Sequence, residues 1–481
     1  MTEHFDVLVI GAGLSGIGAA YHLETRRPDS SFAVLESRAQ LGGTWDLFRY
    51  PGIRSDSDMH TLGFSFKPWR DDKAIAEGPA ILRYLQEAVE ENGLASRIRY
   101  GHAVEAAHWS SETARWTLSV RVDGELRELT AGFLFTCCGY YDYEAGHTPE
   151  FDGRDTFEGQ VVHPQHWPDD LDYDGKRVVV IGSGATAVTL VPELAKRAAH
   201  VTMLQRSPTY FISRPWTDPV ALALRSTLGD QRTYELVRWK NILLQQALYQ
   251  FCRRAPRAAR TLLMSGVRHH VGPDIDVERH FNPSYDPWDQ RVCLVPDADL
   301  FAALRSGAAS IVTDRIARFV PDGIELEQRQ SILEADLVVT ATGLRLRFMG
   351  GIEVTVDGER VDPGERAAYR GIMISGVPNL AFAFGYVNAS WTLRADLTSE
   401  FVCRLLNHMD RHDARRCVPL DDGSAGAHNP FWSLSSGYVR RAMEHFPKQG
   451  ERAPFRAVQS YFEDRASLRN GSLDDGVLEL R

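Results

Sequence analysis

Redox cysteine pairs, an export signal and long apolar runs are all missing from this sequence. None of the six cysteines belongs to a C-x-x-C pair, and their spacings do not suggest a zinc site, so we expect no metal. Reduced thiols are expected in a chain of 481 residues without an evident secretion signal. No segment has the ~18 uncharged apolar residues that a membrane span needs. A cytoplasmic protein is the expectation.

Positive charge is also scarce. The sequence has 54 Lys and Arg against 64 Asp and Glu, which gives a net charge of −10 and argues against nucleic-acid binding. A hydrophobic content of 43% and a charged content of 25% are typical of a packed globular protein. The length suits two or three domains, and no obligate protein partner is evident.

A strand, a glycine-rich loop, a helix and a second strand follow one another twice in the chain. The first unit has an apolar strand at 6–10, a helix at 15–26 and a strand at 32–36. The second has strands at 177–181 and 201–205, with a helix between them that reaches about Arg197. This repetition predicts an α/β fold with two Rossmann-like dinucleotide-binding domains.

The first glycine loop has the G-x-G-x-x-G pattern. Gly11 allows the tight turn, Gly13 lets the backbone approach a pyrophosphate, and Gly16 lets helix and strand pack closely. Glu36 lies twenty residues beyond Gly16, at the end of the second strand, where a carboxylate accepts hydrogen bonds from ribose hydroxyls. Because it would repel a 2′-phosphate, this site is predicted to bind FAD or NAD, not NADP.

The second loop, Gly182 to Ala187, is G-x-G-x-x-A, and no acid occupies its ribose position. Arg206 and Ser207 stand there instead and are suited to a 2′-phosphate, which favours NADPH. One acidic and one basic site together indicate FAD in the first domain and NADPH in the second. Since a disulfide reductase would need a C-x-x-C pair, O2 is the expected electron acceptor.

The chain between these units and after them completes the predicted organisation. Apolar runs at 133–139 and 336–343 should be the last strand of each unit, and the end of the chain, 470–481, is expected to be loosely ordered. We expect an FAD-binding domain at 1–150 and 346–481, an NADP-binding domain at 151–215 and 291–345, and a helical insertion at 216–290.

The helical insertion has an apolar side. Leu236, Trp239, Leu243, Ala247 and Phe251 recur at helical spacing, and four arginines follow. The favoured interpretation is an amphipathic pair packed on the second domain. Peripheral contact with an anionic lipid surface stays open as the alternative.

Between the two glycine loops lies a motif that identifies a family. Residues 157–168 resemble the F-x-G-x-x-x-H-x-x-x-W-P fingerprint of Baeyer–Villiger monooxygenases, and residues 42–45 resemble their G-G-T-W segment. The related flavin-containing monooxygenases usually have Tyr or Phe where Trp167 stands. The resemblance covers essentially the whole chain. Residues 49–59, 282–291 and 388–392 look closest to the ethionamide-activating type of that family.

The resemblance implies a role for each matching residue. FAD contacts correspond to Gly11, Gly13, Ser15, Gly16, Glu36, Thr44, Trp45, Asp46, Leu47, Asp56 and Val104. NADP contacts correspond to Arg54, Ser55, Asp56, Ser183, Gly184, Ala185, Thr186, Ala187, Val188, Thr189, Arg206 and Ser207. The fingerprint residues are Phe157, Gly159, His163 and Trp167, of which the last two would couple domain movement to cofactor binding.

The resemblance also implies a reaction. FAD, NADPH and O2 would convert a ketone to an ester or lactone through a C4a-peroxyflavin, with oxygenation of sulfides or thioamides as a side activity. Arg291 would stabilise the negative charge that develops, and Asp56 would hold Arg291 in place. Gln290 departs from the pattern, since many members have Lys there to help bind the 2′-phosphate. Preference for NADPH would then depend on Arg206.

Two alternatives share the cofactor motifs. One is an enzyme that oxygenates mainly nitrogen or sulfur, and only substrate assays separate it from a ketone oxygenase. The other is a non-catalytic NADPH-binding redox regulator, which would need both nucleotide sites but neither Arg291 nor Asp56.

Overall fold

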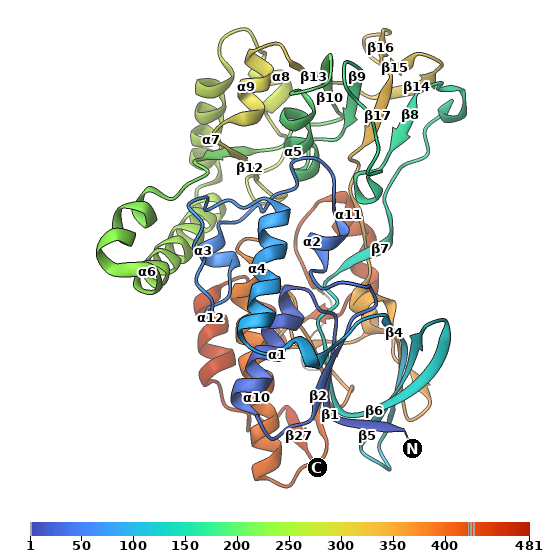
Figure 1. The fold of residues 1–481 in the computed structure, drawn as a ribbon, viewed down its shortest axis with the longest axis vertical. Coiled ribbons are helices and arrows are strands. Elements are labelled where there is room, and N and C mark those ends of the chain that lie inside the picture. Colours follow the sequence, from blue (N-terminus) through green and yellow to red (C-terminus); the bar gives the residue numbers. More distant parts are fainter. Residues whose placement is uncertain (1, 422, 424–425, 427–428) are drawn as a thin grey trace.

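The computed structural model describes residues 2–421, 423, 426 and 429–481 and has two lobes, each built on a sheet (Figure 1). The larger sheet contains 11 strands and lies in the lobe with both chain ends. The smaller sheet has five strands and lies in the other lobe. The structure therefore confirms the predicted α/β fold with two Rossmann-like domains and a helical insertion, while the domain boundaries stay a prediction.

The first lobe is centred on three parallel strands. β1 (Glu3–Ile10) lies between β2 (Phe32–Leu35) and β6 (Glu125–Thr136), and it pairs with both in parallel. Its residues from Val7 to Ile10 are buried, as expected for a strand covered on both faces. Helix α1 (Leu14–Arg26) packs against the long helix α10 (Trp391–Arg411) on one side of this sheet.

An antiparallel extension of the large sheet was not predicted. β4 (His102–Ser110) and β5 (Arg115–Val122) pair with each other, and β5 continues onto β6. Buried residues alternate with less buried ones along β5, so one face of this extension covers the core. The other strands of the sheet are β3 (Ile98–Arg99), β19 (Glu353–Val356), β20 (Glu359–Arg360), β21 (Ala368–Tyr369), β22 (Met373–Ile374) and β23 (Leu380–Phe382).

The second lobe has a fully parallel sheet. Its strand order is β13 (Ala309–Thr313), β10 (His200–Gln205), β9 (Arg177–Ile181), β17 (Leu337–Thr340) and β8 (Gln160–Val162). Helix α5 (Ala185–Leu194) and helix α9 (Asp299–Arg305) pack against each other beside it. A small antiparallel sheet of β14 (Ile316–Val320), β15 (Gly323–Leu326) and β16 (Ile332–Glu334) completes this lobe.

A two-stranded ribbon joins the lobes. β7 (Tyr141–Gly146) pairs in an antiparallel sense with β18 (Leu344–Leu346), and Gly146 stands opposite Leu344. Each strand of the ribbon comes soon after the last strand of a Rossmann unit, β6 or β17. The chain thus crosses between the lobes at the carboxyl ends of both sheets (Figure 1).

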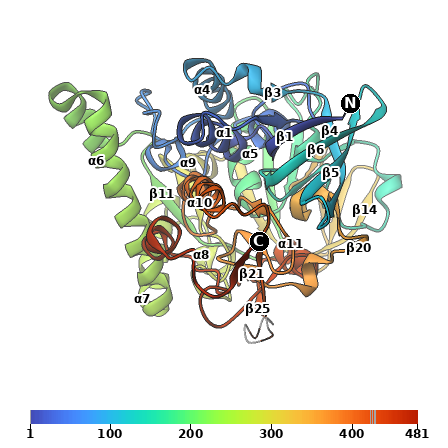
Figure 2. The same ribbon diagram turned by 90° about the horizontal axis from the view of Figure 1, so that it is seen from below.

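The helical insertion runs along one flank of the molecule. It consists of α6 (Pro219–Arg254), which breaks at Gly229 with φ 73°, then α7 (Pro256–Val271) and α8 (Val277–Phe281). Figures 1 and 2 show α6 on the outside of both lobes. The interpretation of an amphipathic pair packed on the second domain holds for α7, which packs on α9 and β11 (Phe211–Arg214). It is wrong for the apolar side of α6, where Leu236 and Leu243 are 53% and 55% exposed. Periodicity had located that side, but among the described residues it stays largely uncovered apart from the contact of Trp239 with Tyr461.

The end of the chain is also better ordered than expected. β27 (Leu478–Leu480) pairs with β24 (Cys417–Pro419), and Leu473 and Leu478 are buried. Arg370 donates from Nη2 to the carbonyl of Ser472 at 2.7 Å. These long-range contacts hold a segment that its polar, glycine-containing sequence suggested would be loose.

Short elements complete the description. They are α2 (Thr44–Leu47), α3 (Met59–Leu62), α4 (Gly78–Glu91), α11 (Gly437–Ala442), α12 (Tyr461–Arg465), β11 (Phe211–Arg214), β12 (Cys293–Pro296), β25 (Asn429–Pro430) and β26 (Lys448–Gln449). Over the described ranges, none of the helices combines the length and apolarity needed to cross a membrane.

Candidate active site

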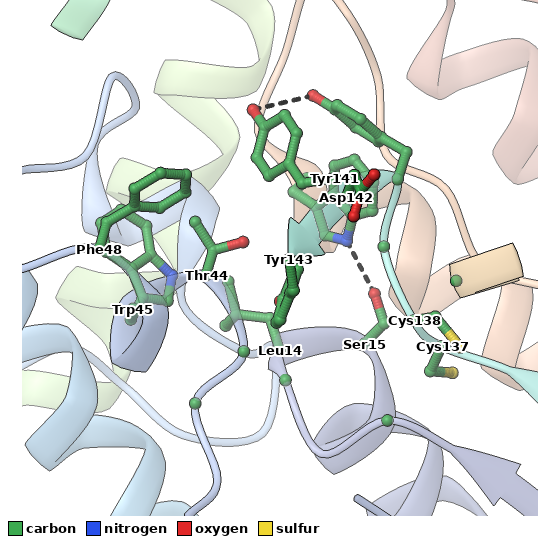
Figure 3. Close-up of a pocket in the computed structure, with 18 of the residues that line it drawn as sticks. Leu14, Ser15, Thr44, Trp45, Phe48, Cys137, Cys138, Tyr141, Asp142 and Tyr143 are labelled. Carbon is green, nitrogen blue, oxygen red and sulfur yellow. Dashed lines mark hydrogen bonds between the residues drawn. The ribbon is translucent and has the colours of Figure 1, made fainter. Parts of the chain in front are cut away.

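A cleft of about 760 Å³ brings residues of both lobes together. Figure 3 shows part of its lining, from the first lobe and the ribbon. It follows the carboxyl ends of the strands, where open α/β sheets bind their ligands. The predicted site residues that line it are Gly11, Gly13, Ser15, Glu36, Thr44, Trp45, Arg54, Ser55, Asp56, Val104, Ala185, Thr186, Thr189 and Arg291. Residues that are up to 280 positions apart in the sequence therefore share one cavity.

Close backbone packing requires glycine at several positions in and around the first glycine loop. Gly11 has φ 102°, and a Cβ on Gly16 would lie 1.7 Å from the carbonyl oxygen of Gly11. Gly13 faces Gly43, and a Cβ on Gly43 would lie 3.1 Å from the Cα of Gly13. Two bare backbone segments thus border the cleft at the start of α1, where free N–H groups favour a phosphate.

Glu36 ends the strand beside this loop and is only 5% exposed. Its Oε2 accepts from the amide of Ala12 at 2.7 Å, and its Oε1 accepts from the amide of Arg38 at 2.9 Å. The carboxylate is therefore fixed in direction, with lone pairs left for a ligand hydroxyl. Together with the glycine loop and Val104 on β4, it forms a cradle whose donors and acceptors fit the adenosine diphosphate part of FAD.

The segment from Thr44 to Leu47 forms the short helix α2, and only its first half faces the cleft. Thr44 and Trp45 line the cavity (Figure 3). Asp46 is buried and accepts hydrogen bonds from Arg38 at 2.6 Å and from Arg49 at 3.3 Å. Leu47 packs into the apolar core of the second lobe. Asp46 and Leu47 thus hold the loop in place and do not line the cavity.

The second glycine loop is also closely packed at Gly182, but the space beside Gly184 is open. Gly182 has φ 141°, and a Cβ there would lie 2.3 Å from the carbonyl oxygen of Ala341. No atom lies within 4 Å of the Cβ position of Gly184, so the space before α5 is free for a ligand. Ala187 and Val188 are buried in the core of the lobe and do not line the cleft.

Arg206 and Ser207 follow β10 and are exposed at the edge of this loop. The hydroxyl of Ser183 donates to the carbonyl of Ser207 at 3.1 Å, which links the loop to the end of the strand. The Arg206 side chain makes no ion pair with any residue of the described ranges, so its charge is available to a phosphate.

Residues 54–56 belong to the first lobe and reach toward the second. Arg54 forms an ion pair with Asp299 at the start of α9 and lies over the ring of Trp216, 5.3 Å from its centroid. The hydroxyl of Ser55 donates to the carbonyl of Ser57 at 2.7 Å. These contacts fix the loop that carries Asp56 into the cleft.

Arg291 and Asp56 meet inside the cleft. Nη1 of Arg291 lies 3.6 Å from Oδ2 of Asp56, and its Nε donates to the carbonyl of Val387 at 3.4 Å. The side chain of Arg291 keeps 38% of its surface, and that surface faces the cavity. Burial alone would lower the pKa of Arg291, but the neighbouring Tyr140 and Asp56 raise the pKa above its ordinary value. Arg291 is therefore a permanent positive charge.

The fingerprint residues do not line the cleft, and one of them, His163, lies against the ribbon between the lobes. Nδ1 of His163 accepts from the amide of Gln165 at 3.1 Å, so its Nε2–H donates to the carbonyl of Gly343 at 3.2 Å. A Cβ on Gly146 would lie 2.0 Å from Cε1 of His163. The imidazole thus packs on both ribbon strands at once.

The other three fingerprint residues are packing residues of the second lobe. Phe157 contacts Phe319 edge to face, with ring centroids 5.8 Å apart, and a Cβ on Gly159 would lie 2.5 Å from the Phe157 ring. Trp167 contacts Tyr173 in the same manner at 6.3 Å.

Comparison with known proteins agrees with this geometry. Residues 6–230 match the family described as flavin-binding monooxygenase-like. The chain is 52% identical over 479 residues to the FAD-containing monooxygenase EthA of Mycolicibacterium smegmatis, covering 99% of this chain and 97% of that one. It is 51% identical over 476 residues to EthA of Mycobacterium tuberculosis, with the same coverage.

The chain belongs to the flavin-binding monooxygenase-like family. Solved structures show the same fold at low identity. An open crystal structure of cyclohexanone monooxygenase has a TM-score of 0.80 at 20% identity and full coverage of both chains. A steroid monooxygenase bound to NADP has a TM-score of 0.78 at 22% identity and 99% coverage of both chains. The predicted cofactors, FAD and NADPH, agree with the FAD named for EthA and with the NADP bound in the steroid monooxygenase structure.

Sequence reasoning missed an aromatic chamber that adjoins Arg291 in this monooxygenase. Tyr140 lies 5.1 Å from Trp391 and 5.0 Å from Trp432, measured between ring centroids. Tyr386 and Tyr438 complete the chamber, and burial raises the pKa of Tyr438 to about 12. Tyr140 follows the last strand of the first unit, and this position in the sequence could have indicated that it lies near the cleft. Trp391 lies in the segment 388–392 that carries the family resemblance, whereas Tyr386, Trp432 and Tyr438 come from segments without a motif.

A group that could hold a metal lies elsewhere. His408 on α10, His412 directly after this helix and Asp474 offer ligand atoms within 4.8 Å of one another, and Nε2 of His408 lies 3.2 Å from Oδ1 of Asp474. Of these three, His408 and Asp474 line a separate surface hollow, so the group has no part in the cleft.

The open position at Gly184 yields a test of the NADPH site. Ala fits the backbone of Gly184, with φ −80° and no neighbouring atom, so Gly184→Ala should leave the melting temperature unchanged. The added methyl group would block the approach of a pyrophosphate, so the KM for NADPH should rise about tenfold. Gly266→Ala on α7 is the matched control because its Cβ position is equally open. An unchanged KM for NADPH in Gly184→Ala would contradict this placement.

His163 yields a test of the ribbon contact. Burial lowers the pKa of His163, and the hydrogen bond to Gly343 only partly opposes this shift. The folded state therefore favours the neutral imidazole, and its contribution to stability is present above the unfolded pKa of about 6.5 and is lost as pH falls. Melting temperature should fall more steeply between about pH 7.5 and pH 5.5 in the parent than in His163→Gln, because glutamine takes up no proton over that range. Equal slopes would exclude His163 as the titrating group.

Proposed function

We propose that this monooxygenase carries out Baeyer–Villiger oxidation: a ketone, O2, NADPH and a proton give an ester or lactone, NADP⁺ and water. Oxygenation of sulfides and thioamides would be a side activity. The observation that carries the proposal is the position of Arg291, a permanent cation between the cofactor cleft and the aromatic chamber. Membership of a monooxygenase family argues against a non-catalytic regulator.

FAD, when bound, supplies the transfer of electrons from NADPH to O2 and the delivery of one oxygen atom to the substrate. The first glycine loop, Glu36 and Val104 would hold its adenosine diphosphate part. Thr44 and Trp45 would contact it further along the cleft.

The NADP side of the cleft would be bound by the second lobe and by residues 54–56. Gly184, Ala185 and Thr186 offer the start of α5 to the pyrophosphate. Arg206 and Ser207 stand where the 2′-phosphate of NADPH would lie. Gln290 supplies no second charge, so Arg206 is the main determinant of preference for NADPH over NADH.

Arg291 would stabilise developing negative charge and would not transfer protons. A guanidinium cannot serve as a general base, but it stabilises the negative charge that develops on the carbonyl oxygen during attack. Asp56 keeps the guanidinium directed into the cleft. Tyr140 and Trp391 line the cleft, and their rings would keep water away from the ketone there, which protects the reactive oxygen species from premature release as H2O2.

Arg206→Gln tests the NADPH preference. Loss of a charge-assisted hydrogen bond to phosphate costs about 1.5–3 kcal/mol, so the KM for NADPH should rise about 10- to 100-fold. The KM for NADH should not change, because NADH has no 2′-phosphate. Arg115→Gln, on the distant strand β5, is the control. Equal effects on both coenzymes would contradict the assignment.

Arg291→Ala tests the proposed reaction. The purified yellow enzyme is incubated with NADPH, 18O2, a linear methyl ketone and an aryl methyl sulfide, and the products are followed by mass spectrometry. The parent should form labelled ester. In Arg291→Ala, ester formation should fall about 10²- to 10³-fold while NADPH oxidation continues and H2O2 is released.

The same experiment separates the alternatives. Arg291→Lys should retain part of the ester activity because it keeps the charge, and Arg115→Ala should retain all of it. Labelled sulfoxide without ester from the parent would show a heteroatom oxygenase. Undiminished ester formation by Arg291→Ala would overturn the role given to Arg291.

A further inference from the structure

Exposed apolar side chains of this protein gather on two helices. Fourteen large apolar residues among those described are exposed, and nine of them lie on α6 and α7, which contain 36 and 16 residues. The nine are Val220, Leu222, Leu228, Leu236, Trp239, Leu243, Leu244, Phe251 and Leu262. Such a concentration marks an interaction surface, since single exposed apolar residues are normally scattered.

The second half of α6 has two distinct sides. Leu236, Leu243 and Phe251 recur on the outer side of the helix, and Trp239 and Leu244 lie beside them. We call these five residues the outer stripe. Trp239 closes the edge of the stripe, where its ring contacts Tyr461. The stripe lies along the flank that α6 and α7 form in Figure 2.

The inner side of α6 is fixed to the first lobe. Arg238 donates from Nη1 to the carbonyls of His60 and Gly63, each at 2.8 Å. Asn241 donates to Oδ1 of Asp58 at 2.9 Å. Because buried polar contacts fix the inner side of α6 to the first lobe, the helix is held in an orientation that leaves the outer stripe exposed.

The excess of positive charge on α6 and α7 indicates that this surface binds an anionic partner. Helices α6 and α7 together have nine Lys and Arg but only Asp230 and Glu235 as acids, whereas the whole chain has a net charge of −10. The side chains of Arg232, Arg254 and Arg257 are exposed and pair with no acid anywhere in the described part of the chain. A second copy placed on the same surface would bring two basic patches together, which is unfavourable.

We propose that the outer stripe and its flanking arginines dock on the surface of a membrane that contains anionic phospholipid. Leucine and tryptophan on one side of a helix enter the headgroup region, and adjacent arginines pair with lipid phosphates. The docked helix lies close to the cleft, because Ile242 on its inner side belongs to one apolar cluster with Leu393 and Tyr386, and Tyr386 lines the cavity. The inference does not depend on which substrate is oxidised.

Vesicle co-sedimentation of the FAD-loaded enzyme tests the proposal. The parent should bind vesicles of phosphatidylglycerol mixed equally with phosphatidylcholine, and binding should weaken as salt is raised. Arg254→Gln with Arg257→Gln should weaken binding about 25-fold, at about 1 kcal/mol per charge. Leu236→Gln with Leu243→Gln should weaken it at least about tenfold. The matched controls are Leu126→Gln, at a 58% exposed leucine outside the surface, and Arg115→Gln with Arg329→Gln.

Several results would overturn the proposal. One is parent enzyme that stays in the supernatant with anionic vesicles. Another is binding that the controls weaken as much as the stripe variants do. A third is a parent that is dimeric without lipid and becomes monomeric in Leu236→Gln with Leu243→Gln, because a second copy would then cover the stripe. NADPH oxidation with a water-soluble substrate reports separately on the proposed function and should be unchanged in all these variants.

Discussion

Close backbone packing around the two glycine loops is the constraint on which this molecule depends. A methyl group on Gly16 would lie 1.7 Å from the carbonyl oxygen of Gly11, so glycine at position 16 lets α1 start directly after β1. A methyl group on Gly182 would lie 2.3 Å from the carbonyl oxygen of Ala341, which follows the neighbouring strand β17. The starts of α1 and α5, where backbone N–H groups are free, line one cleft together with Arg291.

The charges of the cleft follow from this arrangement. Glu36 lines the part of the cleft beside the first glycine loop, and backbone amides hold its carboxylate. Arg206 lies at the edge of the second glycine loop, without an acidic partner among the described residues. Arg291 lines the cleft, and its Nη1 lies 3.6 Å from Oδ2 of Asp56. A tighter ion pair would have neutralised the charge that the proposed reaction needs.

Local motifs made most of the fold predictable, and they are the basis on which both nucleotide sites are predicted. The loops at Gly11 and Gly182 and the residues Glu36 and Arg206 each depend on fewer than forty neighbouring positions, so their spacing is visible in the sequence. The aromatic chamber was not predictable, because Tyr140, Trp432 and Tyr438 meet only after the chain has crossed between the lobes.

Two other expectations failed for a similar reason. Helical periodicity located the apolar side of α6, but periodicity alone cannot say whether protein or something else covers that side. The last residues looked loose because the strand that β27 pairs with, β24, lies about sixty positions earlier in the chain. Local sequence indicates which elements form, whereas what they pack against depends on segments far away.

The helical insertion connects the lobes a second time, on the flank of the molecule. The inner side of α6 is bonded to the first lobe through Arg238 and Asn241, while α7 packs on α9 and β11 of the second. The ribbon holds the lobes at the cleft through His163, and the joint at Ala255 between α6 and α7 holds them at the flank. A rotation of one lobe against the other would therefore have to bend both connections, and a surface bound to α6 and α7 would restrain such a rotation.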